Sequence, residues 1–151
     1  LETTLHAMQD KIDTLNKSAS SKQARIKEVD ELLRMVDYYK SGKPAADKLK
    51  SIRFEKSRQK YKSEHDNELR TFYMAERKLK PHFKDGKLPI AAWRKERAQL
   101  EQEYRDIQTE LSPLHADAKK LWAIHYNIYE VQHEQERQNA ATRQKKQEIE
   151  H

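Results

Sequence analysis

The sequence predicts an all-α protein, an elongated antiparallel helical hairpin (coiled coil) with a helical insertion at its tip. Hydrophobic residues make up 35% of the 151 residues and charged residues 37%, so a thick core buried on all sides is not expected. Only 2 Gly and 4 Pro are present, too few for the tight turns of sandwiches, barrels and Rossmann folds. Two series of apolar residues at heptad spacing complete the prediction, because such a seam holds one helix against another.

The first helix is predicted over residues 2–39. Its apolar residues follow steps of three and four, broken only by Lys22: they are Leu5, Met8, Ile12, Leu15, Ala19, Ile26, Val29, Leu33 and Val36. A turn is expected at residues 41–44, where Gly42 suits the position after a helix and Pro44 suits the first turn of the next one.

The insertion at the tip is predicted over residues 45–80, as one short helix followed by a longer one. The second helix is expected to end near Lys80, because the residue before Pro81 avoids the helical conformation. The residues expected to face inward are Leu49, Ile52, Tyr61, His65, Leu69, Phe72, Leu79 and, after the proline, Phe83.

The last helix is predicted over residues 90–131, after a turn at residues 85–89. Its heptad seam consists of Trp93, Leu100, Tyr104, Ile107, Leu111, Leu114, Ala118, Leu121, His125 and Ile128. Pro113 lies inside this seam, and the residues leave open whether the helix is kinked or broken there; the uninterrupted heptad phase favours a kink.

The first and last helices are expected to pair antiparallel, which brings Val36 near Trp93 and Leu5 near His125. Lys22, the polar seam position, then either faces water beside Pro113 or is buried with an acidic residue of the last helix. Residues 1–131 form a single helical domain in this interpretation, and 132–151 form a polar helical extension or a frayed tail. Because the first residue is not Met, we expect a segment of a longer protein.

Several classes of function are disfavoured by residues that are missing. The chain has no cysteine, so disulfide frameworks and thiolate zinc sites are absent and the cytoplasm is the expected compartment. No apolar run is long enough for a membrane span, and no membrane partner is expected. The seven histidines lack metal-site spacing, and no phosphate-binding glycine loop or nucleophile motif is present. We therefore expect no metal, cofactor or catalytic residue, and no enzyme activity.

The basic residues are unevenly distributed, which points to DNA phosphates as a partner. Residues 40–62 hold nine basic and two acidic residues, a net charge of +7, and residues 77–97 hold eight and two, a net charge of +6. Residues outside 40–97 carry a net charge of −4. Such polarity is typical of a phosphate-contacting end on a neutral support. The predicted DNA-binding residues are Lys43, Lys48, Lys50, Arg53, Lys56, Arg58, Lys60, Lys62, Lys84, Lys87, Arg94 and Arg97.

Aromatic residues are interleaved with these bases and admit two interpretations. Tyr61, Phe72, Tyr73 and Phe83 could stack on unpaired bases, but their helical spacing favours core packing. The alternative to DNA contact is a structural coiled-coil or protein-interaction module, in which the seams pair between two chains of a homodimer and the lysines only maintain solubility.

Five features follow one another along the chain: a long heptad helix ending in Asp37-Tyr38-Tyr39-Lys40, a basic helix, Glu64-His65-Asp66 opening the run to Leu79, the Leu88-Pro89 turn and a closing helix through residues 98–104. Their order resembles the C-terminal region of relaxases, the mobilisation nucleases of conjugative or mobilisable bacterial plasmids and transposons. The resemblance covers residues 12–131.

The resemblance implies a nuclease domain located N-terminal to this segment, which nicks DNA with a tyrosine and a histidine-bound metal. Neither feature is carried over, because the paired-histidine motif is absent and no tyrosine has a matching context. The implied role is that of a non-catalytic accessory domain during plasmid or transposon transfer. It would bind single-stranded or hairpin DNA, or assemble the relaxosome and transfer-machinery proteins.

Overall fold

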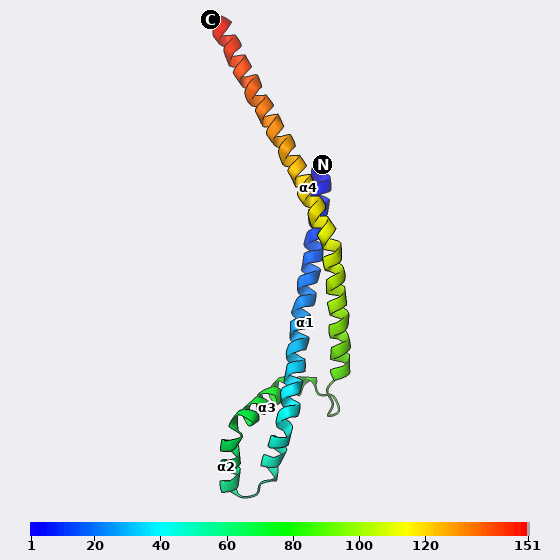
Figure 1. The fold of residues 1–151 in the computed structure, drawn as a ribbon, viewed down its shortest axis with the longest axis vertical. Coiled ribbons are helices and arrows are strands. Elements are labelled where there is room, and N and C mark those ends of the chain that lie inside the picture. The colour runs from blue at the N-terminus through cyan, green and yellow to red at the C-terminus, as the bar shows by residue number, and fades with distance from the viewer. Residues whose placement is uncertain (151) are drawn as a thin grey trace. The chain divides into compact units, whose positions relative to one another are not determined.

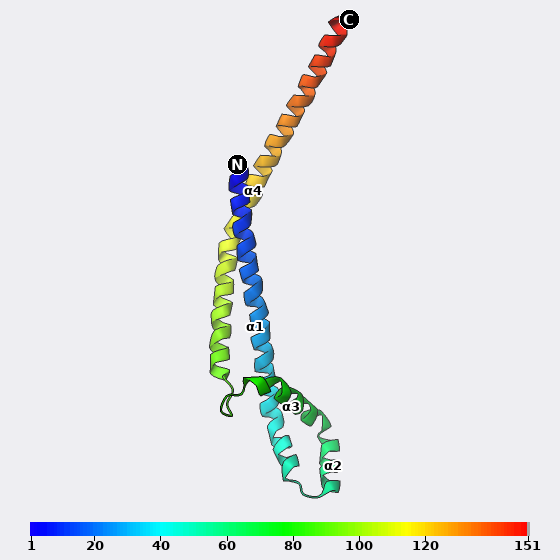
Figure 2. The same ribbon diagram turned by 180° about the vertical axis from the view of Figure 1, so that it is seen from behind.

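The computed structural model describes residues 1–150, and within them the fold is all-α, as the sequence predicts. Four α-helices and one 3₁₀ turn follow one another along the chain (Figures 1 and 2). They are α1 (Glu2–Ser51), α2 (Glu55–Glu64), α3 (Asp66–Leu79), η1 (Lys80–His82) and α4 (Ile90–Glu150). By its internal contacts the chain divides into two compact units, residues 1–20 with 105–151 and residues 21–104.

In the unit of residues 21–104, α1 and α4 run antiparallel and pack around a shared apolar core. The direction follows from two contacts, since Gln23 bonds to Tyr104 whereas Asp30 bonds to Arg97. The core combines side chains of α1, α3 and α4: Val29, Met35, Val36, Ala75, Leu79 and Trp93. The predicted proximity of Val36 and Trp93 is confirmed, because the heptad seams of both helices face this core.

The turn predicted at residues 41–44 is wrong, because α1 continues through Gly42 and Pro44 to Ser51. Gly42 is buried where α1 crosses α3, and a Cβ atom added to it would lie 2.6 Å from Cβ of Phe72. The glycine thus permits a close helix crossing. The cost of Pro44 inside a helix is offset downstream, where Ala45, Ala46 and Leu49 pack against Leu69 and Phe72.

The insertion differs from the prediction in where its helices divide. The expected short helix around Leu49 is the end of α1, and the expected longer helix is split at His65 into α2 and α3. Pro81 ends α3 at Leu79, close to the predicted position, and a 3₁₀ turn follows. The predicted turn before α4 is also present, with positive φ angles of 52° at Asp85 and 74° at Gly86.

In the unit of residues 1–20 with 105–151, the beginning of α1 packs antiparallel against the middle of α4. The buried seam residues are Leu5, Ile12, Ala19, Ile107, Leu111 and Ala118. Lys11 Nζ lies 3.6 Å from Glu110 Oε1, and His125 Nε2 lies 3.8 Å from Glu2 Oε1. Ile128, predicted as a seam residue, is 45% exposed and lies three residues beyond the contact of His125 with Glu2.

Helix α4 is uninterrupted at Pro113, so the break left open by the sequence is excluded. It also passes the expected end at residue 131 and continues to Glu150, so residues 132–150 are helical. The predicted domain boundary after residue 131 stays a prediction. Within the described residues, no helix combines the length and the apolar character needed to cross a bilayer.

Candidate nucleic-acid interface

The twelve predicted DNA-binding residues all lie in the unit of residues 21–104, on four stretches of chain. Ten of them are exposed, and Arg58 and Arg97 are half-buried. The stretches are the end of α1 (Lys43, Lys48, Lys50), the α1–α2 connection with α2 (Arg53, Lys56, Arg58, Lys60, Lys62), the turn before α4 (Lys84, Lys87) and the start of α4 (Arg94, Arg97).

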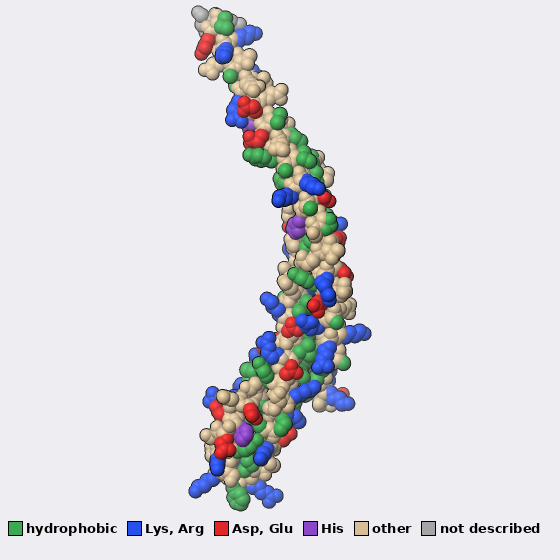
Figure 3. Space-filling view, in the orientation of Figure 1, with side chains coloured by type: hydrophobic (Ala, Val, Ile, Leu, Met, Phe, Trp, Pro, Cys, Tyr) green, Lys and Arg blue, Asp and Glu red, His purple; other side chains and the backbone are tan. Residues whose placement is uncertain are grey.

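The fold brings the end of α1 and all of α2 together into one basic surface. We call residues 40–62 the basic end. It holds nine cations, and the chain reverses direction once within it, at residues 52–54. The two helices touch through Lys48, whose Nζ lies 5.5 Å from the centre of the Tyr61 ring. Blue Lys and Arg side chains surround this end at the bottom of the space-filling view (Figure 3).

The nine cations of the basic end have no carboxylate partner among the described residues. Each ion pair found in residues 1–149 uses a cation outside 40–62. Of the acidic residues nearby, Glu55 accepts a hydrogen bond from Gln59 on its own helix. The positive charge of this end is therefore available to an external anion, which is what phosphate binding requires.

The cations along the α1–α4 contact behave in the opposite way, because carboxylates of α4 neutralise them. Arg25 Nε lies 2.6 Å from Glu96 Oε1, and Lys22 Nζ lies 2.7 Å from Glu103 Oε2. The hydrogen bond from Arg25 lowers the pKa of Glu96, and those from Lys22 and Gln99 lower the pKa of Glu103. Lys22 thus pairs with Glu103, an acidic residue of the last helix that lies ten positions before Pro113.

Arg97 belongs with these neutralised cations rather than with the basic end. Its guanidinium donates hydrogen bonds to Asp30 on α1 and to Glu101 on its own helix. The bond to Asp30, the largest cause, raises the pKa of Arg97. The guanidinium of Arg97 is therefore already bound to two carboxylates of the same chain, and these contacts do not support the prediction that Arg97 binds phosphate. Arg94, one turn earlier, is exposed and has no ion pair among the described residues.

The aromatic residues considered as base-stacking platforms are mostly part of the core. Phe72 is 4% exposed and stacks on Tyr39 with ring centres 5.0 Å apart, while Tyr61 stacks on His65 at 4.1 Å. The aromatic residue that sequence reasoning missed is Phe54, which is 77% exposed in the α1–α2 connection. The sequence features that could have identified Phe54 are its position beside Arg53 and its place outside both heptad seams.

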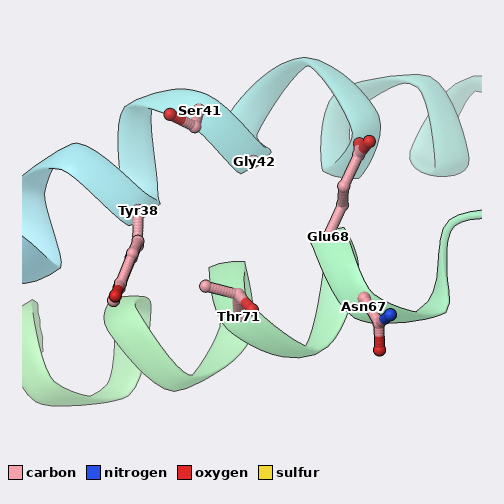
Figure 4. A pocket seen from close by; sticks show the side chains of 6 residues that line it. All are labelled: Tyr38, Ser41, Gly42, Asn67, Glu68 and Thr71. Atoms are coloured by element: carbon pink, nitrogen blue, oxygen red, sulfur yellow. The ribbon is translucent and has the colours of Figure 1, made fainter.

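A depression between α1 and α3 lies next to the basic end but has a different character. Its volume is about 370 Å³, and Figure 4 shows the lining side chains, which are Tyr38, Ser41, Asn67, Glu68 and Thr71 around the backbone of Gly42. Its one charged side chain is a carboxylate, which repels phosphate. Among the described residues, no group of three or more His, Cys, Asp or Glu is placed to hold a metal ion.

Comparison of the chain with protein-family models gives no match, and comparison with curated proteins and with solved structures gives none either.

Proposed function

We propose that this chain is a non-catalytic accessory domain of a bacterial DNA relaxase, which holds DNA through phosphate contacts at the basic end. The observation that carries the proposal is that the nine cations of residues 40–62 have no carboxylate partner among the described residues, although Lys43 and Lys48 lie over the rings of Tyr39 and Tyr61. Cations used for helix pairing have carboxylates within 4 Å, whereas these do not, so ion pairing within the chain does not account for them. Phosphate is the anion whose regular spacing along a chain suits such an array.

The binding energy comes from release of the counterions that surround DNA. For a single strand, the logarithm of the binding constant falls by about 0.7 for each neutralised phosphate per tenfold rise in salt. We expect the lysine and arginine side chains of the basic end to contact the sugar-phosphate backbone, and such contacts carry no sequence information. We therefore expect binding with strong salt dependence and little sequence preference.

Phe54 gives this surface a preference for unpaired DNA. Its side chain is 77% exposed beside Arg53 and near Lys56, so a base that approaches with its phosphate can stack on the ring. Stacking on an aromatic residue contributes about 1–3 kcal/mol per base and needs a base that is not already paired. Single-stranded DNA and the loop of a DNA hairpin meet this condition, whereas a closed duplex does not.

The relaxase assignment rests on the resemblance over residues 12–131, and the charge distribution supports it. A nuclease that nicks one strand exposes unpaired DNA, and a non-catalytic region near it would hold that strand or gather the other proteins of the relaxosome. Such a protein acts in the bacterial cytoplasm. The absence of catalytic motifs in the sequence agrees with an accessory role.

The test is fluorescence anisotropy of the 151-residue chain with labelled single-stranded, hairpin and duplex DNA across a salt series. The test variant reverses five cations of the basic end to Glu: Lys48, Lys50, Arg53, Lys56 and Arg58. A control of equal net charge reverses five exposed lysines outside it: Lys17, Lys27, Lys119, Lys145 and Lys146. We expect the first variant to lose binding and the control to retain most of it, with equal helicity by circular dichroism.

Two results contradict the proposal. No binding by the unmodified chain at about 50 mM salt, where phosphate contacts are strong, excludes DNA contact. An equal loss in both variants shows that net charge, and not the basic end, is responsible. If the unmodified chain does not bind DNA, the remaining candidate is a structural coiled coil, which the exposed apolar residues of α4 favour.

A further inference from the structure

The chain between α3 and α4 forms a short hairpin at residues 84–87. Two backbone hydrogen bonds join Lys84 and Lys87, from Lys84 N to Lys87 O at 2.9 Å and from Lys87 N to Lys84 O at 3.0 Å. Asp85 and Gly86 form the turn with φ angles of 52° and 74°, and positive φ at both central residues is the geometry of a type I′ turn. The two lysines are therefore a directly opposed antiparallel pair.

The residues that flank this pair decide which way the lysines point. Phe83 and Leu88 are half-buried and pack against the core shared by α1, α3 and α4. Because successive side chains of an extended chain point to opposite faces, Lys84 and Lys87 both point away from this core, and both are exposed. The Cβ atoms of such a pair lie about 4.5–5.5 Å apart, so the two ammonium groups can reach the same ligand.

The hairpin places two like charges side by side without a carboxylate between them. Like charges directly opposite each other on paired strands are destabilising. Asp85 is the one acidic residue of the range 77–95, and it forms no ion pair among the described residues. An anion held by both ammonium groups removes the repulsion between them, so this geometry is suited to binding one.

The surroundings of the hairpin favour a polyanion as the source of that anion. Residues 77–95 hold seven basic residues and one acidic residue, a net charge of +6. Lys78 pairs with Glu31, with Nζ and Oε1 3.4 Å apart. The other six are exposed and have no ion pair among the described residues: Arg77, Lys80, Lys84, Lys87, Arg94 and Lys95. A surface of one charge sign concentrates ligands of the opposite charge.

An acidic segment separates the hairpin from the basic end. Residues 63–76 hold four acidic residues and one basic residue, a net charge of −3, and the basic one, Arg70, pairs with Asp66 at 3.1 Å. In both views α3 lies between the α1–α2 connection and the turn before α4 (Figures 1 and 2). Its 14 residues span about 21 Å. Phosphates are therefore attracted at the two ends of α3 and repelled along it.

We propose that Lys84 and Lys87 together bind one phosphate of the DNA strand that the basic end holds, so that the strand spans α3. The inference rests on the proposed function and adds to it a second contact and a minimum strand length. At about 3.4 Å between the phosphates of a stacked strand, a span of about 21 Å corresponds to roughly six nucleotides. A strand that reaches both sites binds more tightly, because its second contact is intramolecular.

The test measures fluorescence anisotropy with single strands of about four and about sixteen nucleotides, which are shorter and longer than the span. The variant is Lys84→Gln with Lys87→Gln. We expect it to bind the longer strand about tenfold more weakly than the unmodified chain and the shorter strand equally well. For the longer strand, the slope of log affinity against log salt should become shallower by about 0.7, the value for one phosphate.

The matched control is Lys17→Gln with Lys27→Gln, which removes the same charge from two exposed lysines outside both basic surfaces. The control should bind both strands as the unmodified chain does. The melting temperature of the hairpin variant at low salt should stay the same or rise, because the substitution removes two opposed like charges. A lower melting temperature would show that the two lysines stabilise the fold, which contradicts an unpaired anion site.

The inference and the proposed function fail in different ways. Unchanged affinity of the hairpin variant for the longer strand, or an equal loss for both strand lengths, overturns the hairpin site. If the basic-end variant loses binding in the same experiment, the proposed function remains in place. An unmodified chain that binds neither strand overturns both.

An equal loss in the hairpin variant and the matched control also overturns the hairpin site, since net charge then explains the effect.

Discussion

Arg25 of α1 and Glu96 of α4 form an ion pair with Nε and Oε1 2.6 Å apart, which connects the two helices in the unit of residues 21–104. Arg25 also bonds to Glu28 on its own helix, and its hydrogen bonds to Glu96 and Glu28 raise its pKa. The guanidinium therefore stays charged at every pH at which the protein is folded. Only the carboxylate can titrate, which makes the contact sensitive to acid.

We predict that the contribution of this pair to stability disappears in acid. The pKa of Glu96 is lowered from its ordinary value of 4.5 by the hydrogen bond from Arg25. Because the folded pKa is below the unfolded one, the stabilisation is present above about pH 4.5 and is lost as the pH falls through the folded pKa. Glu96→Gln should destabilise the chain by less than about 1 kcal/mol at neutral pH, since both side chains are more than one third exposed.

Thermal unfolding of the unmodified chain and of Glu96→Gln between about pH 7 and about pH 3 checks this prediction. The difference between the two midpoints should close as the pH falls. Glu148→Gln, in the exposed tail of α4, is the control and should match the unmodified chain throughout. A difference that is constant with pH would show that the pair does not titrate in this way.

Gly42→Ala should destabilise the protein, although alanine is the better helix former. The new Cβ atom would lie 2.6 Å from Cβ of Phe72 and 3.2 Å from the carbonyl oxygen of Glu68, so α1 and α3 would have to move apart. We expect a net loss of about 1–3 kcal/mol from overpacking, measured by urea unfolding. Ser41→Ala, an exposed neighbour, should change stability little. Gly42→Ala at unchanged or increased stability would contradict the close crossing.

Arg94 and Arg97 should respond oppositely to the same substitution. Arg97→Glu places a third carboxylate beside Asp30 and Glu101, so the melting temperature should fall while the loss of DNA affinity stays small. Arg94→Glu changes an exposed side chain and should reduce DNA affinity with little change in melting temperature. Melting curves and anisotropy of the two variants provide the comparison. The reverse outcome would assign Arg97 to the DNA contact.

The difference between these two arginines shows where sequence reasoning reached its limit. Heptad spacing is a local pattern, and it correctly predicted the inward face of α1 and of most of α4. The prediction of a turn at residues 41–44 was wrong because the packing of α1 on α3, a long-range contact, overrode the local preference of Gly42 and Pro44. Which carboxylate an arginine pairs with is also decided by long-range contacts. The sequence therefore shows how many cations there are but not that Arg97 is paired and Arg94 is exposed.

Phe54→Ala should remove the preference for unpaired DNA without changing the fold. The ring is 77% exposed, so little packing is lost, and we expect single-strand affinity to fall about 5- to 150-fold while duplex affinity stays the same. Phe54→Trp should retain the preference, because the larger ring also stacks. Tyr126→Ala, which removes another exposed aromatic side chain from the other unit, is the control. Anisotropy with single-stranded and duplex DNA of equal length, and with single-stranded RNA, measures these affinities; an equal fall for single strand and duplex would mean that Phe54 does not stack on bases.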